Sequence, residues 1–424
     1  MKSAELKALI NEGALKKYDS LYPDLQKQSE RIITAVDCFS KRFGEEREVC
    51  VFSAPGRTEI IGNHTDHNLG KCIAGAVDRD IIAIAAKNDD GKIRVLSEGF
   101  SEELVDLSKE ILPESFKKST SSALIGGIVK GFTERSYDVG GFDAYLTSSL
   151  PIGSGLSSSA AYEVLICTVL NHLYNEGRVG AVEVAKISQY SENEFFGKPS
   201  GLLDQLASSV GGFVYMDFED KSNPKIEEIN FSLSDAGYAL CIVNTGGSHA
   251  NLDAVYASVP GEMKQIAKLL GRDTLRGLSE DDLLKNAVNL RRIAGDRALL
   301  RSIHFVRENE RVDKLKDALK DKNITEFLKN VNGSGRSSFE YLQNVYNPET
   351  PKEEGIALAL ALADGYFEGK AAAYRVHGGG FAGTAQIFLP VTEVRSFSEY
   401  MDSLFGVGAA TVLNIRPAGG IKLF

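Results

Sequence analysis

The segment "VFSAPGRTEIIGNHTDHNLGK", residues 51–71, joins an apolar strand to a turn crowded with polar side chains. His64, Asp66 and His67 lie on that turn, a few residues after Arg57, and an ordinary surface loop does not need this mixture. A zinc site would need a third or fourth ligand and usually a helical platform. The chain has six histidines in all, so a polyhydroxylated ligand fits these convergent polar groups better than a metal ion.

The length and charge of the chain limit the classes of function. A chain of 424 residues predicts two domains rather than one core. Its 48 basic and 58 acidic residues give a net charge of −10, which disfavours nucleic acid and anionic membranes as partners. Five scattered cysteines without a CxxC pair, and no long apolar run, predict a reduced, cytoplasmic protein.

The order of expected elements is typical of a mixed α+β protein. Helical spacing covers residues 4–17 and 24–43, and strands begin near residue 48. Later helices and strands alternate irregularly, and residues 281–345 are mainly helical. A domain boundary is expected between residues 210 and 235, where a helical loop gives way to new strands.

A second segment, "LPIGSGLSSSAAYEVL" at residues 150–165, has the composition of a phosphate-binding loop. A helix that begins within the serines would present unpaired N–H groups and a positive dipole to a phosphate. The glycines let the phosphate approach the backbone. The serine hydroxyls and Glu163, one turn into the helix, could serve phosphate or Mg²⁺. A flexible linker capped by serine is the alternative.

A third segment, "VHGGGFAGTAQIF", contains a G-x-G-x-x-G pattern at Gly378, Gly380 and Gly383. A dinucleotide site would need a helix after it, whereas "TAQIFLP" predicts a strand. The glycines therefore predict either a plain hairpin or a turn that packs closely against a ligand or another loop.

A fourth segment, "KPSGLLDQLASSVGG" at residues 198–212, places Asp204 in apolar surroundings. A buried carboxylate needs a partner, and Arg57 is the expected one. Such a pair could steer the proton of a sugar hydroxyl and balance charge during phosphoryl transfer. A helix-capping aspartate is an equal alternative from this segment alone.

In this order, the four segments resemble the GHMP small-molecule kinase family and its galactokinase branch. The branch motif GRxNLIGEHTDYN is matched by "GRTEIIGNHTDHN", and the other segments match the family's serine loop, aspartate loop and glycine turn. The resemblance implies an α+β, two-lobed GHMP kinase fold, with a ribosomal-S5-like N-terminal domain and a ferredoxin-like C-terminal domain. We expect a helical leader at residues 1–25, then domains at 26–215 and 216–424.

The resemblance also implies roles for individual residues. Arg57 and Asp204 would be the catalytic pair beside the anomeric hydroxyl of galactose. The residues expected to bind the sugar are Asn63, His64, Asp66, Gly201 and Tyr256. Those expected to bind ATP are Gly153, Ser154, Gly155, Leu156, Ser157, Ser158 and Ser159. The residues expected to serve Mg²⁺ are Ser158, Ser159 and Glu163. The expected partners are a small-molecule sugar and ATP, with no nucleic acid or membrane, and a monomer is expected.

The sequence departs from the branch motif at four positions. Asn63 stands where the family has a glutamate that is expected to accept a hydrogen bond from the 6-hydroxyl of galactose, and Glu59 stands where the family has asparagine. His67 and His377 are the other two departures. The product expected first is galactose 1-phosphate. Losing a carboxylate near C6 leaves galacturonate, arabinose or N-acetylgalactosamine as alternatives. A non-catalytic galactose and ATP sensor is a second class, although the intact "GLSSSAA" segment favours catalysis.

Overall fold

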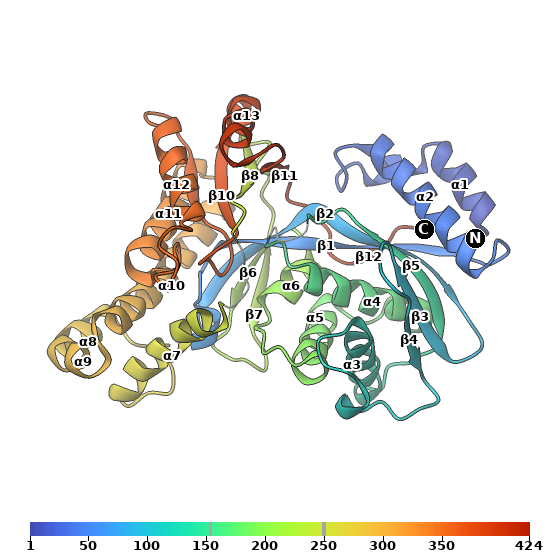
Figure 1. Cartoon of the computed structure of the whole chain (residues 1–424), viewed down its shortest axis with the longest axis horizontal. Coiled ribbons are helices and arrows are strands. Elements are labelled where there is room, and N and C mark those ends of the chain that lie inside the picture. The colour runs from blue at the N-terminus through green and yellow to red at the C-terminus, as the bar shows by residue number, and fades with distance from the viewer. Residues whose placement is uncertain (152–154, 248–251) are drawn as a thin grey trace.

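The computed structural model describes residues 1–151, 155–247 and 252–424. Two β-sheets form the frame, and helices cover both faces of the larger sheet (Figure 1). The longer helices are α1 (Ser3–Asn11), α2 (Leu25–Phe43), α3 (Ser121–Glu134), α4 (Ser158–Tyr174), α5 (Ala181–Tyr190), α6 (Leu203–Val210), α7 (Asp253–Leu269), α8 (Glu280–Lys285), α9 (Ala287–Ala294), α10 (Asp296–Lys320), α11 (Ile324–Ser337), α12 (Gly355–Tyr366) and α13 (Val394–Phe405).

The strands of the larger sheet come from both ends of the chain. The order β12-β1-β2-β5-β3-β4 forms the main path, β6 pairs with β2, and β7 pairs with β6. Their bounds are β1 (Cys50–Ile61), β2 (Lys71–Lys87), β3 (Lys92–Ser97), β4 (Glu103–Asp106), β5 (Phe142–Ser148), β6 (Phe213–Asp217), β7 (Lys225–Ile229) and β12 (Ile421–Lys422). The last strand therefore returns to the sheet that the first strand opens.

The smaller sheet is antiparallel and has the order β11-β8-β10-β9. Its strands are β8 (Tyr238–Asn244), β9 (Ala373–Val376), β10 (Thr384–Pro390) and β11 (Ala410–Leu413). The expected glycine turn joins β9 to β10, as the sequence predicted. Helices α12 and α13 share a buried apolar cluster with this sheet, which includes Ile356 and Phe397.

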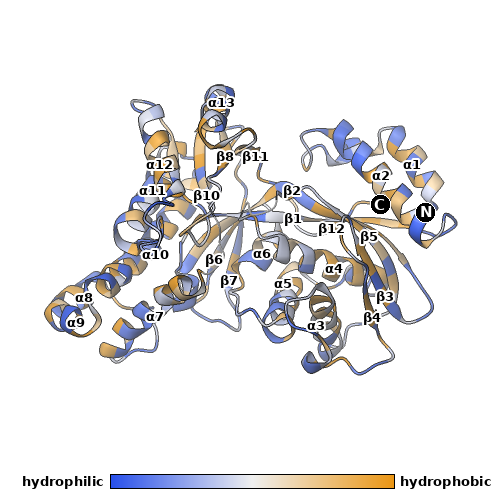
Figure 2. Ribbon diagram, viewed as in Figure 1, coloured by the Kyte–Doolittle hydropathy of each residue, from blue (hydrophilic) through white to orange (hydrophobic). Residues whose placement is uncertain are grey.

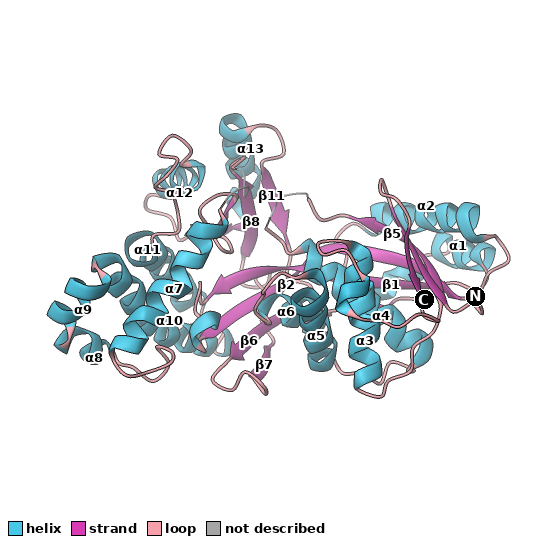
Figure 3. Cartoon of the chain, turned by 60° about the horizontal axis from the view of Figure 1, so that its bottom comes forward, coloured by secondary structure: helices cyan, strands magenta, loops and turns pink. Residues whose placement is uncertain are grey.

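The two faces of the larger sheet bury alternate residues of the same strands. Ile82 and Ile84 of β2 pack with α1 and α2, whereas Ala83 and Ala85 belong to the core on the opposite face. This alternation follows from the two-residue period of a strand. Helices α3 to α6 cover that opposite face (Figures 1 and 3). The strands are largely apolar, while α1 and α2 mix apolar and polar segments (Figure 2).

The leader packs in the apolar core between the larger sheet and helices α1 and α2. Leu6 and Leu21 are buried with the apolar side of α2, which includes Phe39. Asp24 caps α2 by accepting a hydrogen bond from the backbone N–H of Lys27 at 3.0 Å. The sequence did not decide between a leader that packs on the core and one that mediates contacts, and the structure shows the first of these.

Most of the expected elements are confirmed, including the helix that begins within the serines at Ser158. Helices α3, α7 and α12 were not predicted. The pairing of β6 with β2 and of β7 with β6 extends the larger sheet to Ile229. The division of the chain at residues 215 and 216 stays a prediction. Among the described residues, no helix is both long and apolar enough to cross a bilayer.

A buried ionic cluster ties the leader to the C-terminal tail. Asp80 is fully buried on β2, and its carboxylate accepts from Arg31 of α2 at 2.6 Å and from Arg416 near the C-terminus at 3.2 Å. Tyr22 of the leader donates to the same carboxylate at 2.8 Å. Burial alone would raise the pKa of Asp80, but the two guanidinium groups outweigh it and lower the pKa to about 2.

Replacing Asp80 with asparagine leaves two buried or half-buried guanidinium groups without a counter-charge. We expect Asp80→Asn to lower the free energy of unfolding at pH 7 by about 3–5 kcal/mol, measured by urea denaturation. Asp37, which pairs with Lys7 on the surface, gives the control: Asp37→Asn should cost less than about 1 kcal/mol. Because the folded-state pKa of Asp80 is depressed, its contribution is present above about pH 4 and is lost as the pH falls toward 2. Equal costs for the two variants would contradict this account.

Candidate functional site

A small cavity gathers most of the polar residues that the sequence singled out. Its volume is about 160 Å³, and it is lined by Arg57, Glu59, Asn63, His64, Asp66, His67, Ser200, Gly201, Leu203, Asp204, Gly378 and Gly379. These residues come from β1, the turn that follows it, the loop and first turn of α6, and the glycine turn between β9 and β10. Three segments far apart in the chain, residues 57–67, 200–204 and 378–379, therefore converge.

Arg57 and Asp204 form a two-pronged ion pair in the wall of this cavity. Arg57 Nε donates to Asp204 Oδ1 at 2.6 Å, and Arg57 Nη2 donates to Asp204 Oδ2 at 2.9 Å. The third prong, Arg57 Nη1, donates to the carbonyl oxygen of Gly155 at 2.6 Å. The planar guanidinium thus fixes β1, α6 and the serine loop in one arrangement.

The environment of Asp204 favours its ionised form. Burial would raise the pKa of this carboxyl, but the charge of Arg57, together with hydrogen bonds from Arg57 and from the Ser157 hydroxyl, holds the pKa below its usual value. A third of the Asp204 side chain remains exposed, on the cavity side. At neutral pH the group is therefore a fixed anion that can accept a hydrogen bond.

His64 and Asp66 form the turn at the other side of the cavity. His64 adopts a left-handed backbone conformation with φ of 56°, which is uncommon for a residue other than glycine. Its Nε2 donates to the carbonyl oxygen of Gly379 at 2.9 Å. Burial lowers the pKa of His64 to about 4, and the neighbouring His67 adds to this effect, so the ring is neutral at pH 7.

Gly201 lies against the Asp66 carboxylate, which would have to move if residue 201 had a side chain. A Cβ atom at residue 201 would lie 2.3 Å from Asp66 Oδ2, which is closer than any real contact. The absence of a side chain therefore lets the Asp66 carboxylate reach the cavity wall.

Asn63 lines the cavity, and its expected role as a sugar ligand stays a prediction. Its side chain is fully buried, and Nδ2 donates to Glu59 Oε1 at 2.9 Å and to the carbonyl oxygen of Gly378 at 2.7 Å. Its Oδ1 accepts from Asn344 Nδ2 at 2.6 Å and from the Ser338 hydroxyl at 3.4 Å. An amide offers two donors and two acceptor positions, so protein groups occupy all of them.

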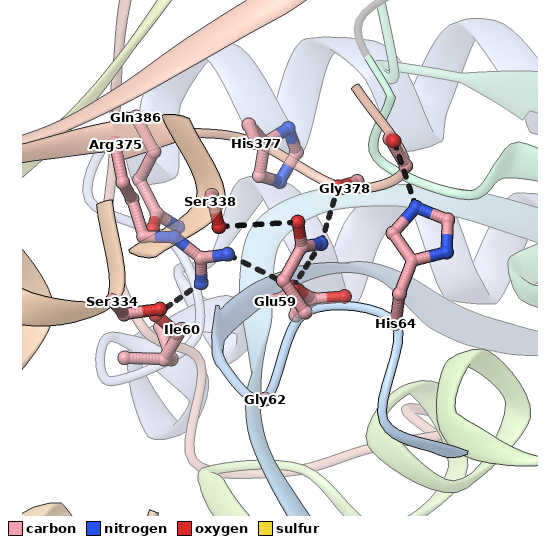
Figure 4. Close-up of polar contacts among 12 residues, drawn as sticks. Glu59, Ile60, Gly62, His64, Ser334, Ser338, Arg375, His377, Gly378 and Gln386 are labelled. Atoms are coloured by element: carbon pink, nitrogen blue, oxygen red, sulfur yellow. Dashed lines mark hydrogen bonds and ion pairs between the residues drawn. The ribbon is translucent and has the colours of Figure 1, made fainter. Parts of the chain in front are cut away.

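The cavity wall also contains the carboxylate of Glu59, which was not predicted among the site residues. It belongs to β1 and lines the cavity, and Arg375 of β9 donates to its Oε1 at 3.2 Å (Figure 4). Burial raises the pKa of Glu59, and the charges of Arg375 and Arg57 oppose this effect. The only sequence signal was its departure from the family motif. The structure therefore shows a carboxylate in the cavity wall in contact with Asn63.

A second cavity of about 460 Å³ shares Arg57, Asp204, Gly378 and Gly379 with the first. It lies at the N-terminus of α4 and is lined there by the expected Gly155, Leu156, Ser157, Ser158 and Ser159. Gly153 and Ser154 lie outside the described residues. Tyr256 of α7 lines this second cavity and donates to the carbonyl oxygen of Gly380 at 2.8 Å. The structure thus places Tyr256 beside the expected phosphate site.

Glu163 is fully buried in α4 and is not among the residues that line either cavity. Gln205 Nε2 donates both to Glu163 Oε2 at 3.1 Å and to Glu192 Oε2 at 2.8 Å, and Ser159 donates to Glu192 Oε1 at 3.3 Å. Burial raises the pKa of Glu163 well above its usual value, and the nearby Glu192 adds to the shift. Glu163 Oε1 has no hydrogen-bond partner among the described residues.

The described residues contain no cluster of three or more histidine, cysteine, aspartate or glutamate side chains that could hold a metal ion by themselves. Another cavity of about 820 Å³ lies between the leader, β7 and the smaller sheet. It includes none of the site residues expected from the sequence.

Two family models match separate parts of the chain. A model described as a galactokinase galactose-binding signature matches residues 37–87, which include β1 and the turn after it. The N-terminal domain model of GHMP kinases matches residues 123–212, which include the serine loop and Asp204.

Solved structures show the same fold. The galactokinase of Lactococcus lactis in complex with galactose is 24% identical and has a TM-score of 0.77, over 92% of this chain and all of that one. The mevalonate kinase of Methanococcus jannaschii is 15% identical, with a TM-score of 0.60 over 87% of this chain and 98% of that one. The α+β, two-domain GHMP kinase fold is confirmed.

Sequence relatives match nearly the whole chain. The galactokinase of Streptomyces coelicolor is 31% identical over 92% of this chain and 97% of its own length. The galactokinase of Enterococcus faecalis is 30% identical over 91% of this chain and 98% of its own length. With its four motif segments gathered around the Arg57–Asp204 pair, the chain belongs to the galactokinase family of GHMP kinases.

Proposed function

We propose that this protein transfers the γ-phosphoryl group of ATP to the anomeric hydroxyl of galactose, giving galactose 1-phosphate. The observation that carries the proposal is the position of the Arg57–Asp204 pair, which belongs to the walls of both cavities. A sugar in the smaller cavity and a triphosphate in the larger one would meet at this pair. The relatives named as galactokinases and the galactose-bound Lactococcus structure support the choice of sugar.

Asp204 positions the attacking hydroxyl in this mechanism. Its depressed pKa makes it a weak base at neutral pH, so its main contribution is to accept the hydroxyl hydrogen bond and fix the line of attack. Arg57 holds the carboxylate in place and offsets the negative charge that builds up on the transferring group.

The N-terminus of α4 holds the phosphates. The helix begins with free N–H groups, and Ser157, Ser158 and Ser159 at this end line the larger cavity. Mg²⁺ would supply charge neutralisation on the phosphate oxygens. Ser158 and Ser159, which line the larger cavity, would hold it there. Glu163 lies outside both cavities, so its expected role as a third ligand stays a prediction.

The remaining residues around the smaller cavity bind and orient the sugar. His64, Asp66 and Gly201 line the cavity directly. Asn63 holds the turn and Glu59 in position rather than binding sugar, because its amide is fully occupied. Tyr256 as a sugar ligand stays a prediction. The free cysteines, three of them buried, are consistent with the proposed cytoplasmic location, and we propose that the protein acts as a monomer.

Substituting the central carboxylate separates turnover from sugar binding. We expect Asp204→Asn to lower kcat by about 100-fold or more, with a much smaller change in KM for galactose, in an assay coupled to ADP release. Asp143 offers a control, because it is a buried aspartate paired with Arg47 and Arg94 away from both cavities. Asp143→Asn should lower stability while the folded enzyme keeps its kcat. A near-normal kcat for Asp204→Asn would show that this residue has no part in the mechanism. If the unaltered protein bound galactose and released no ADP, it would be a sensor and not an enzyme.

A methyl group at residue 201 tests the placement of Asp66. Because the added Cβ would collide with Asp66 Oδ2, we expect Gly201→Ala to raise KM for galactose about tenfold or more, with a smaller effect on KM for ATP. Gly180 has open space around its Cβ position and an ordinary φ of −68°, so Gly180→Ala is the matched control. Unchanged galactose kinetics in Gly201→Ala would show that Asp66 does not contact the sugar.

A further inference from the structure

The smaller cavity has an open carboxylate oxygen on β1. Glu59 Oε1 accepts from Asn63 Nδ2 and from Arg375 Nη2. In the part of the chain that the structure describes, no protein group donates to the second oxygen, Glu59 Oε2. The residue is 8% exposed and lines the cavity, so this oxygen is open toward a ligand.

The strand geometry fixes where Glu59 lies relative to the catalytic pair. Arg57 pairs with Ala76 and Glu59 with Ala74, so the register is regular between these two residues. Side chains two apart on a strand share one face and are separated by about 7 Å. Asp204 and Glu59 line the same cavity, so a sugar with its C1 hydroxyl at Asp204 would extend along this wall toward Glu59.

The surroundings of Glu59 hold its carboxylate in one orientation. Arg375 is fully buried and also donates to the carbonyl oxygen of Ile60 at 2.6 Å (Figure 4). Asn63 is fixed in turn by Asn344 and by the Gly378 carbonyl. Both donors reach the same oxygen, so the other one is presented to the cavity by a rigid support.

We propose that Glu59 is the specificity-determining residue for the end of the sugar opposite C1, where Oε2 accepts a hydrogen bond from a hydroxyl and repels a carboxylate. The inference rests on the proposed function and narrows its substrate class to sugars with a neutral hydroxymethyl group at C6. Galacturonate, one of the alternatives from the sequence, would place its carboxylate against that of Glu59. The carboxylate that the family motif has at residue 63 would thus be supplied four residues earlier, by Glu59.

The variant Glu59→Gln tests this inference with two sugars, galactose and galacturonate. Asn63 and Arg375 both donate, so they would hold the amide oxygen of the new side chain and turn its NH₂ group toward the sugar. An NH₂ group at this position would attract the carboxylate of galacturonate. It could not accept a hydrogen bond from a sugar hydroxyl. We expect the ratio of kcat/KM for galacturonate to that for galactose to rise about tenfold or more.

Deoxy sugars identify the hydroxyl that Glu59 binds. The unaltered enzyme should discriminate against 6-deoxygalactose or 4-deoxygalactose, and Glu59→Gln should reduce that discrimination for the one whose missing hydroxyl contacts Glu59. Glu262 is the matched control, because its carboxylate is also held by arginines, Arg297 and Arg301, and it lines neither cavity. Glu262→Gln should leave all three substrate ratios unchanged.

A second variant covers the case in which Glu59→Gln does not fold. The exchange of Glu59→Asn with Asn63→Glu keeps the charge and composition of the pair, and it should retain the preference for galactose over galacturonate. If Glu59→Gln lowers kcat/KM for every sugar by the same factor, Glu59 only supports Arg375 and the inference is wrong. If no sugar releases ADP, the proposed function fails instead, and calorimetric binding of galactose and galacturonate to both proteins still tests Glu59.

Discussion

The guanidinium of Arg57 is the constraint on which the site depends. Its three nitrogens reach both oxygens of Asp204 and the carbonyl oxygen of Gly155, so one side chain joins β1, α6 and the serine loop. A lysine could not make the same planar, forked set of hydrogen bonds. The two cavities meet at this point because the three segments are fixed to one rigid group.

The larger sheet makes that arrangement possible. Strand β1 is buried along nearly its whole length, between α1 and α2 on one face and α3 to α6 on the other. Its register with β2 fixes the spacing of Arg57 and Glu59, and the turn after it is held by contacts to α10 and to the glycine turn of the smaller sheet. The buried Asp80 cluster joins the leader, β2 and the C-terminal tail on the same sheet.

The sequence predicted the parts of this molecule that depend on local patterns. The strand through residue 51, the helix beginning at the serines, the glycine turn and the approach of Arg57 to Asp204 all followed from composition, spacing and charge. The partners of Asn63 and Glu59 could not be predicted, because Ser338, Asn344 and Arg375 come from segments more than 270 residues away in the chain. The return of β12 to β1 and the burial of Glu163 behind Gln205 likewise depend on long-range packing.

The central claim is that sugar and nucleotide meet at the Arg57–Asp204 pair. A crystal structure of the protein with galactose and a non-hydrolysable ATP analogue tests it most directly. The account predicts the anomeric oxygen within hydrogen-bond distance of Asp204, the far end of the ring at Glu59, and the terminal phosphate at the N-terminus of α4. Galactose bound in the 820 Å³ cavity beside the leader, or a triphosphate away from the serines, would contradict it.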